Sequence, residues 1–236
     1  MTDPVNRSAA ILESSRRIFR EHGALGLRIS EIAKDVGISV GTFYSNFRSK
    51  EDLLMAMGHE CLDERLKGFE GVLQTPGLNA LEKVVLSILR NFIFTFDHPE
   101  LYAIERIARS PSVWEESSEE ARIATNDKYR MITAIVRAQF MSAIKGGYIR
   151  ADGELSQQST NIQIGMWTIS SGSSQVAQIR NTMGEEASLV RRLPDGFLAT
   201  VKAFLLGSGW TSQDPDSDIQ RLADMALDLD LEIPVH

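Results

Sequence analysis

Residues 29–47, with the sequence ISEIAKDVGISVGTFYSNF, decide the fold of the N-terminal part of this chain. Their first half places apolar side chains at positions 29, 32, 33 and 36, which is the spacing of one helix face. Gly37 then tolerates the positive φ of a tight turn, and Ser39 is a residue type that caps helices. The segment therefore predicts two short helices, at about 29–36 and 39–47, joined by a turn.

The side chains of this helix pair suit a helix-turn-helix. Such a motif needs its second helix to cross the first closely and to enter a DNA major groove about 12 Å wide. Ala33 supplies a small side chain at the crossing. Apolar anchors toward the first helix of the chain are Ile32, Val36, Ile38 and Phe43. The second helix is left with short, mostly polar exposed side chains, which are Val40, Gly41, Thr42, Ser45 and Asn46.

Two further helices flank the pair. Residues 8–22 show helical spacing of apolar side chains, with three arginines on the opposite face and Gly23 as a stop signal. Ser49 is suited to cap a fourth helix, because the acids Glu51 and Asp52 that follow it favour the positive end of the helix dipole. This fourth helix is expected to run to about Phe69.

The rest of the chain also reads as helices. They are expected near 78–96, 98–109, 112–145, 154–182, 194–207 and 216–229, separated by Gly, Pro and Asp turn signals. No stretch alternates with the period of a strand. The sequence therefore predicts an all-α fold with an N-terminal three-helix domain, residues 1–51, and a larger helical domain, residues 52–236.

Charge is distributed unevenly between these two parts. The whole chain carries a net charge of −7, which argues at first against nucleic acid as a partner. Residues 1–50, however, hold eight Lys and Arg against five Asp and Glu, so the acidic excess lies in the remainder. A basic head on an acidic body suits a DNA-binding protein, since DNA repels the body. Chance variation in surface charge is the alternative.

Several classes of function are not indicated by the sequence. No apolar run reaches the length of a membrane span, and the N-terminus lacks the order of a secretory signal. The single Cys61 forms no internal disulfide framework, so a reducing cytoplasm is the expected location. His59 and Cys61 point to different helix faces, and Pro99 makes Asp97-His98-Pro99-Glu100 an ordinary helix start. We expect no metal, no cofactor and no catalysis.

Residues 37–54, GISVGTFYSNFRSKEDLL, resemble the signature of the TetR family of bacterial transcriptional regulators. The family pattern is a Gly-hydrophobic-Ser turn, then Gly-Thr-hydrophobic-Tyr, a further hydrophobic residue, and Ser-Lys-Glu opening the next helix. Residues 11–23 resemble the first helix of that family, and 31–33 resemble its second. The resemblance covers about residues 8–56, roughly a fifth of the chain.

This resemblance implies a set of DNA contacts. Ser39 and Thr42 would bind phosphate or base edges, Tyr44 would give its hydroxyl to a phosphate, and Lys50 would contact the backbone. Phosphate contacts set the register, whereas base-edge contacts specify sequence. Relatives often place Thr or Ser as a cap before the second helix; here Arg28 stands there and can reach a phosphate instead. The positions that read bases in relatives are Val40, Gly41, Ser45 and Asn46.

The resemblance assigns dimerisation and effector binding to the larger domain. The residues expected at a homodimer interface are Ile162, Gly165, Met166, Ile169, Phe197, Val201 and Phe204. Those expected around an effector pocket are Phe92, Phe96, Tyr102, Arg106, Trp114, Met131 and Phe140. The same apolar stripes would also serve an intramolecular core, and aromatic or Met side chains at helical spacing are more often core than ligand wall.

The resulting hypothesis is a homodimeric, ligand-responsive repressor that binds double-stranded DNA at a palindromic operator. A small apolar or amphipathic effector would release it. The alternatives are a helical enzyme or protein-interaction module without specific DNA binding, and an activator or architectural DNA binder without a ligand.

Overall fold

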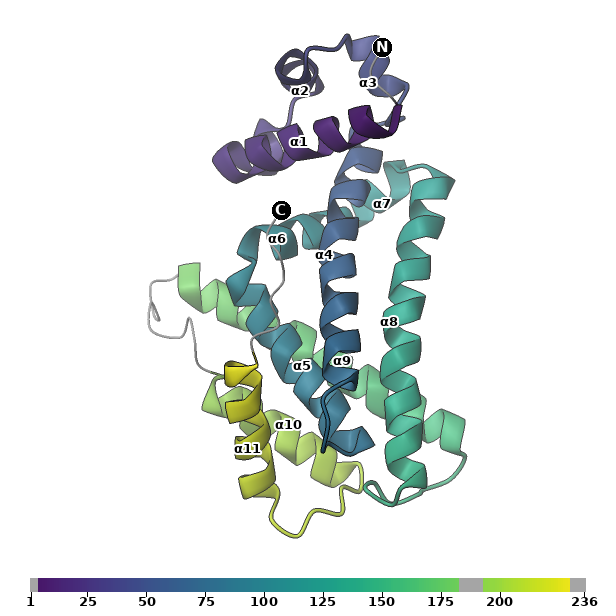
Figure 1. Ribbon diagram of the computed structural model, residues 1–236, viewed down its shortest axis with the longest axis vertical. Coiled ribbons are helices and arrows are strands. Elements are labelled where there is room, and N and C mark those ends of the chain that lie inside the picture. Colours follow the sequence, from purple (N-terminus) through teal and green to yellow (C-terminus); the bar gives the residue numbers. More distant parts are fainter. Residues whose placement is uncertain (1–3, 183–192, 230–236) are drawn as a thin grey trace. The chain divides into compact units, whose positions relative to one another are not determined.

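The computed structural model describes residues 4–182 and 193–229, which form helices joined by loops (Figure 1). The helices of these described residues are α1 (Pro4–Gly26), α2 (Ile29–Val36), α3 (Val40–Tyr44), α4 (Lys50–Leu73), α5 (Ala80–Asp97), α6 (Pro99–Ala108), α7 (Pro111–Glu116), α8 (Glu119–Lys145), α9 (Leu155–Thr182), α10 (Asp195–Gly207) and α11 (Pro215–Asp228). An isolated bridge between Ile149 and Trp210 is the β pairing found in the described ranges. The predicted all-α fold class is confirmed.

The chain divides into two compact units. Unit 1 contains residues 1–63 and 99–129, and unit 2 contains residues 64–98 and 130–236, within the described ranges. The long helices α4 and α8 contribute to both. The boundary that the sequence suggested between residues 51 and 52 separates the expected DNA-binding part from the rest, whereas the two units are defined by their internal contacts. The sequence boundary therefore stays a prediction.

Unit 1 is built around one hydrophobic cluster. Its N-terminal helices pack in sequence, α1 on α2 and α2 on α3 (Figure 1). Ile11, Ile32 and Phe43 bring one fully buried side chain from each of these helices, and Ile104 of α6 and Val113 of α7 join the same cluster. Burying each such side chain contributes about 1.5–3 kcal/mol. The three N-terminal helices therefore share their core with α6 and α7.

Unit 2 is a bundle in which α5 contacts α9 and α11, and α10 contacts the same two helices. A capping box starts α5: the Asn79 side chain accepts from the Glu82 backbone N–H, and the Glu82 carboxylate accepts from that of Asn79. Inside the bundle, the ring of Phe92 stacks on that of Phe197, with centroids 4.3 Å apart. This stack joins α5 to α10.

Several predicted helix bounds differ from the observed ones, and hydrogen bonds explain two of the differences. The expected helix 112–145 is interrupted: the Ser117 hydroxyl donates to the Trp114 carbonyl, and the Ser118 hydroxyl accepts from the Ala121 N–H. Side-chain bonds of this kind end one helix and cap the next. The second helix of the motif ends at Tyr44 instead of Phe47, since the Asn46 N–H binds the carbonyl three residues back, in a tighter turn.

Candidate nucleic-acid interface

The turn before α3 has the geometry that the sequence predicted. Gly37 adopts a φ of 73°, and its N–H binds carbonyls at the end of α2. Ser39 follows in an extended conformation and caps α3, accepting a hydrogen bond from the Thr42 N–H at 3.0 Å. The Ser39 and Thr42 hydroxyls are also 2.8 Å apart. Both hydroxyls therefore lie together at the start of α3, where the predicted phosphate contacts begin.

The short helix α3 separates its buried side from its exposed side. Phe43 is fully buried in the unit 1 cluster, while Val40, Gly41 and Ser45 are exposed. Neighbouring Tyr44 is 48% exposed, and its ring meets Phe43 edge-on with centroids 5.6 Å apart. Such aromatic pairs hold a ring in one orientation. The predicted contact surface of α3 is thus exposed to solvent, while the buried Phe43 side chain holds the helix in place.

Two of the predicted contact residues are engaged inside unit 1. The Asn46 amide donates to the Thr42 carbonyl at 2.7 Å, and its oxygen accepts from the Ser8 hydroxyl at 3.0 Å. The Lys50 ammonium donates to the Ala24 carbonyl at 3.2 Å. These bonds tie α3 and α4 to α1. These bonds use one N–H and one lone pair of the Asn46 amide and one donor of the Lys50 ammonium, so both groups keep further hydrogen-bonding capacity.

Arg28 stands at the N-cap position of α2 and makes no side-chain cap bond there. Its guanidinium is exposed and lies 3.3 Å from the Glu31 carboxylate, within the same turn. The structure therefore fits the departure from the family pattern seen in the sequence: this residue does not cap α2, and its charge remains at the surface.

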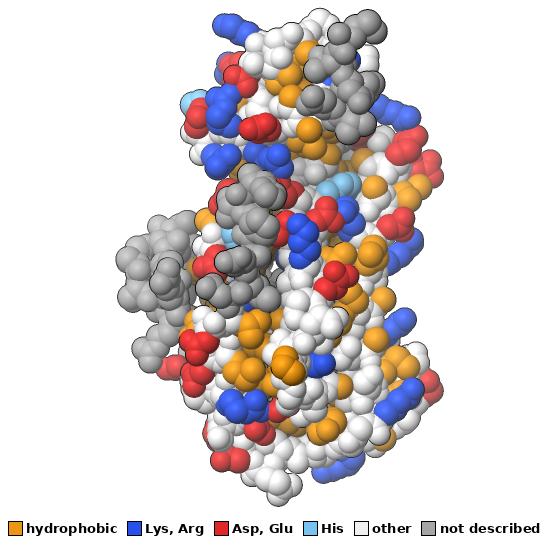
Figure 2. Space-filling view, viewed as in Figure 1, with side chains coloured by type: hydrophobic (Ala, Val, Ile, Leu, Met, Phe, Trp, Pro, Cys, Tyr) orange, Lys and Arg blue, Asp and Glu red, His pale blue; other side chains and the backbone are white. Residues whose placement is uncertain are grey.

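Several cations of residues 1–50, on α1 and just before α4, are paired with acids, a feature that the charge count did not reveal. Arg16 pairs with Glu60 of α4, Arg17 pairs with Asp35 of α2, and Arg48 lies 2.8 Å from Glu120 of α8. Figure 2 shows acidic side chains interspersed with the basic ones over these helices. The basic excess of residues 1–50 is thus reduced by two acids from later in the chain.

Asp35 also shows the effect of its surroundings on ionisation. The Ser14 hydroxyl, which donates to its carboxylate at 2.6 Å, and the Arg17 guanidinium lower the pKa of this carboxyl group. In return, Asp35 raises the pKa of Arg17. The ionised carboxylate therefore links α1 to α2, the first helix of the predicted motif.

Comparison with known proteins decides the family. Residues 11–57 match the family model described as bacterial regulatory proteins, tetR family. The repressor AcnR of Corynebacterium efficiens is 27% identical over 149 residues, which are 63% of this chain and 72% of the relative. Residues 11–57 are therefore a TetR-family DNA-binding domain. The chain is a transcriptional regulator with a DNA-binding helix-turn-helix.

Other TetR-family relatives match more partially or by fold alone. The fatty acid metabolism regulator protein of Bacillus subtilis is 29% identical over 89 residues, 37% of this chain and 45% of the relative. The solved structure of FadR from Bacillus subtilis in complex with stearoyl-CoA has a TM-score of 0.60 at 18% identity, covering 84% of this chain and 98% of that one. A SmeT–triclosan complex has a TM-score of 0.59 at 16% identity, covering 88% and 93%. At these identities the structures show a shared fold.

The residues predicted for the effector pocket lie in both units. In unit 2, Phe92 and Phe96 are in ring contact, Phe140 is fully buried, and Met131 is 52% exposed. In unit 1, Tyr102 is buried and Trp114 packs against the hydrophobic cluster, while Arg106 belongs to the last turn of α6. The Phe92 ring is stacked on Phe197, so at least this predicted pocket residue has a core role.

The residues predicted for the dimer interface are found mostly inside unit 2. Ile162, Met166, Phe197 and Val201 are buried, and Ile169 is partly so. A Cβ at Gly165 would lie 2.2 Å from the Phe204 ring, so this glycine lets α10 approach α9 closely. Burial of these side chains fits the intramolecular core that the sequence left open. The large exposed hydrophobic side chains of the same two helices, within the described residues, are Ile164, Trp167, Val176, Ile179 and Leu206.

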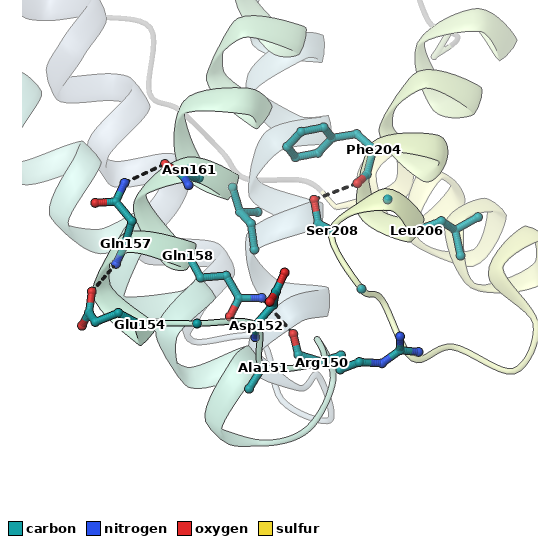
Figure 3. Close-up of a pocket in the computed structure, with 14 residues that line it drawn as sticks. Arg150, Ala151, Asp152, Glu154, Gln157, Gln158, Asn161, Phe204, Leu206 and Ser208 are labelled. Carbon is teal, nitrogen blue, oxygen red and sulfur yellow. Dashed lines mark hydrogen bonds between the residues drawn. The ribbon is translucent and has the colours of Figure 1, made fainter.

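A groove of about 740 Å³ opens in unit 2 between the start of α9 and the end of α10 (Figure 3). Polar side chains line its α9 wall, where Gln158 donates to the Arg150 carbonyl and Gln157 to the Asn161 side chain. Phe204 and Leu206 come from α10 on the other side. The groove contains none of the predicted pocket residues, and it adjoins two of those expected at the interface, Ile162 and Phe204.

Metal binding and membrane crossing can be judged for the described ranges. No group of three or more His, Cys, Asp or Glu side chains there could hold a metal ion. In the same ranges, no helix is long and apolar enough to cross a membrane.

Proposed function

We propose that this TetR-family regulator binds a palindromic operator as a homodimer and represses transcription until a small apolar or amphipathic effector releases it. The observation that carries the DNA contact is the exposed face of α3, which begins at the Ser39–Thr42 pair and continues to the braced Tyr44 ring. Its two hydroxyls and its half-exposed phenol are donors suited to phosphate oxygens, as Val40 is suited to a thymine methyl group.

The exposed side of α9 and α10 supports the homodimer. Ile164, Trp167, Val176 and Ile179 of α9 are each between 39% and 57% exposed, and Leu206 of α10 is 44% exposed. Apolar side chains gathered on two adjacent helices are typical of an interface between subunits. A second copy related by a twofold axis would cover them with its own α9 and α10, giving a four-helix bundle. The proposed interface is therefore the outer face of these helices.

A dimer would place two α3 helices in successive major grooves, roughly 34–36 Å apart. The effector would act through α4, which starts at Lys50 beside the DNA-binding helices and continues into unit 2. Support for an effector comes from relatives of the same fold, whose structures hold stearoyl-CoA and triclosan. Support for repression comes from AcnR, which is named a repressor. Linkage requires that the operator and the effector weaken each other's binding by the same factor.

A mobility-shift titration with the intergenic DNA upstream of the gene tests the operator contact. Specific binding should weaken steeply as salt rises, because each phosphate contact releases counterions. Absence of a shift at low salt would favour a helical enzyme or protein-interaction module instead. Sedimentation velocity tests the dimer, and a thermal-shift screen of apolar and amphipathic compounds tests the effector. A regulator that binds DNA but responds to no compound would fit an architectural binder or a ligand-free activator.

A further inference from the structure

A buried carboxylate in unit 1 joins three helices outside the helix-turn-helix. Glu105 of α6 is 2% exposed. Its carboxylate accepts a hydrogen bond from the Tyr129 hydroxyl of α8, and its other oxygen is 3.7 Å from the Cys61 thiol of α4. Arg109, which directly follows α6, lies 3.7 Å from the carboxylate and 4.8 Å from the centre of the Tyr129 ring. A buried charge is retained at a cost unless its partners are in place.

An independent feature places α6 close to α4 at the same level. A Cβ added at Gly58 would lie 3.0 Å from the Ala108 Cβ and 3.7 Å from the Glu105 Cα. The glycine therefore lets the backbone of α4 approach α6 next to the carboxylate. Close approach and a buried hydrogen-bonding centre together set the register of these two helices, because neither tolerates a shift of one residue.

The position of α6 matters to the DNA-binding helices through the neighbouring residue. Ile104, adjacent to Glu105, is 2% exposed and belongs to the same hydrophobic cluster as Phe43 and Phe47. Phe43 is the buried anchor of α3. A second tie supports the same arrangement: the Asp52 carboxylate of α4 accepts from the Ser118 N–H at 2.7 Å. The packing of Phe43, and with it the position of α3, thus depends on helices that lie far from α3 in sequence.

We propose that Glu105 is a positioning residue for operator binding, which acts through Ile104 and α4 on the helix that contacts DNA. This inference rests on the proposed operator contact of α3, and Glu105 touches no DNA itself. Its carboxylate holds α4, α6 and α8 in one arrangement. That arrangement fixes the position of Phe43, the buried residue of α3. A role in DNA recognition is thereby assigned to a residue more than fifty positions beyond the helix-turn-helix.

The test compares full-length variants that keep the side-chain volume and remove either the charge of this centre or its tyrosine hydroxyl. They are Glu105→Gln, Tyr129→Phe and the double variant. The matched control is Ser170→Ala in unit 2, where the buried Ser170 hydroxyl accepts from the Asn91 amide at 3.2 Å. The measurements are anisotropy of a labelled duplex from the upstream intergenic region, the urea midpoint of each variant, and hydrogen exchange of residues 29–47.

Each unit 1 variant should weaken duplex binding roughly three- to tenfold, and the double variant should lose less than the product of the two. Hydrogen exchange of residues 29–47 should be faster in each of these unit 1 variants than in wild type. The control should lower the urea midpoint yet leave the duplex affinity and the exchange of 29–47 unchanged. Unit 1 variants that lose stability but keep wild-type affinity and exchange would overturn the proposal. If wild type itself binds no duplex, the exchange measurement still decides whether Glu105 positions α3.

Discussion

Removing one hydroxyl from α3 would test the proposed phosphate contact most directly. In Tyr44→Phe the ring remains and keeps its edge-on contact with Phe43, so the fold of unit 1 has no reason to change. Tyr44 is 48% exposed, and surface substitutions of this kind alter the free energy of unfolding by no more than about 0.5 kcal/mol. Any larger effect of the variant must therefore lie in DNA binding.

The expected reduction in affinity follows from the chemistry of this hydrogen bond. A hydrogen bond to a charged group contributes about 1.5–3 kcal/mol, and the lower value corresponds to roughly a tenfold change in affinity. A dimer has two DNA-binding domains and would lose the contact in both, so the affinity should fall roughly a hundredfold. The hydroxyl is neutral and releases no counterion, so the slope of log affinity against log salt should stay unchanged. Arg28→Gln, by contrast, should reduce the slope by about one for each phosphate that the guanidinium neutralises.

The assay is fluorescence anisotropy of the upstream duplex with wild type, Tyr44→Phe and Arg28→Gln at several salt concentrations. Thermal unfolding of each protein serves as the control for folding. Tyr44→Phe with wild-type affinity and wild-type unfolding would refute a phosphate contact by this hydroxyl. A changed salt slope in Tyr44→Phe would show that the substitution disturbs charged contacts as well, and the tenfold expectation for each head would then not apply.

Three further substitutions test the packing of α9 on α10, the proposed interface and the ionisation of Asp35. Gly165→Ala should lower the free energy of unfolding by about 1–3 kcal/mol in urea denaturation, because the added Cβ overlaps the Phe204 ring. Gly172→Ala is the control, since the space around its Cβ is open and no such loss is expected. Equal effects of the two substitutions would contradict this packing. Trp167→Glu should convert dimers to monomers in sedimentation velocity, and an unchanged sedimentation coefficient would count against the outer face of α9. The depressed pKa of Asp35 means that its stabilising effect is present above the ordinary value of 3.8 and is lost as the pH falls through the folded-state pKa. Asp35→Asn should therefore narrow the gap between urea midpoints at pH 7 and pH 3, and a gap equal to that of wild type would contradict the link to Ser14 and Arg17.

Local sequence was sufficient for the helix-turn-helix. The turn at Gly37 and the cap at Ser39 depend on backbone conformation and on atoms within four residues, so their residue types predict them directly. The interruption at Ser117 and Ser118 was missed, since the surrounding residues are good helix formers and serine also occurs within helices. That break is decided by one hydrogen bond that the Ser117 hydroxyl donates and one that the Ser118 hydroxyl accepts, and the sequence shows neither.

The larger helices were predicted, but the orientation of their faces was not. Helical spacing places Ile162, Met166 and Val201 on apolar helix faces. The same spacing is expected for a face that packs inside the subunit and for one that packs against a second subunit. The fold buries these residues and leaves Ile164 and Trp167 outside. Which stripe faces inward depends on the neighbouring helices, and single-helix periodicity carries no information about them.

The sequence by itself determined the helical class, the helix-turn-helix and its family, because these follow from short-range spacing and from a motif of contiguous residues. Only the tertiary structure decided how that motif is supported. Glu105 meets Cys61 and Tyr129 across three helices, and Arg48 meets Glu120 over a separation of 72 residues. Such partners are brought together by packing of distant segments, whose free energy depends on the whole unit rather than on any local pattern of residues.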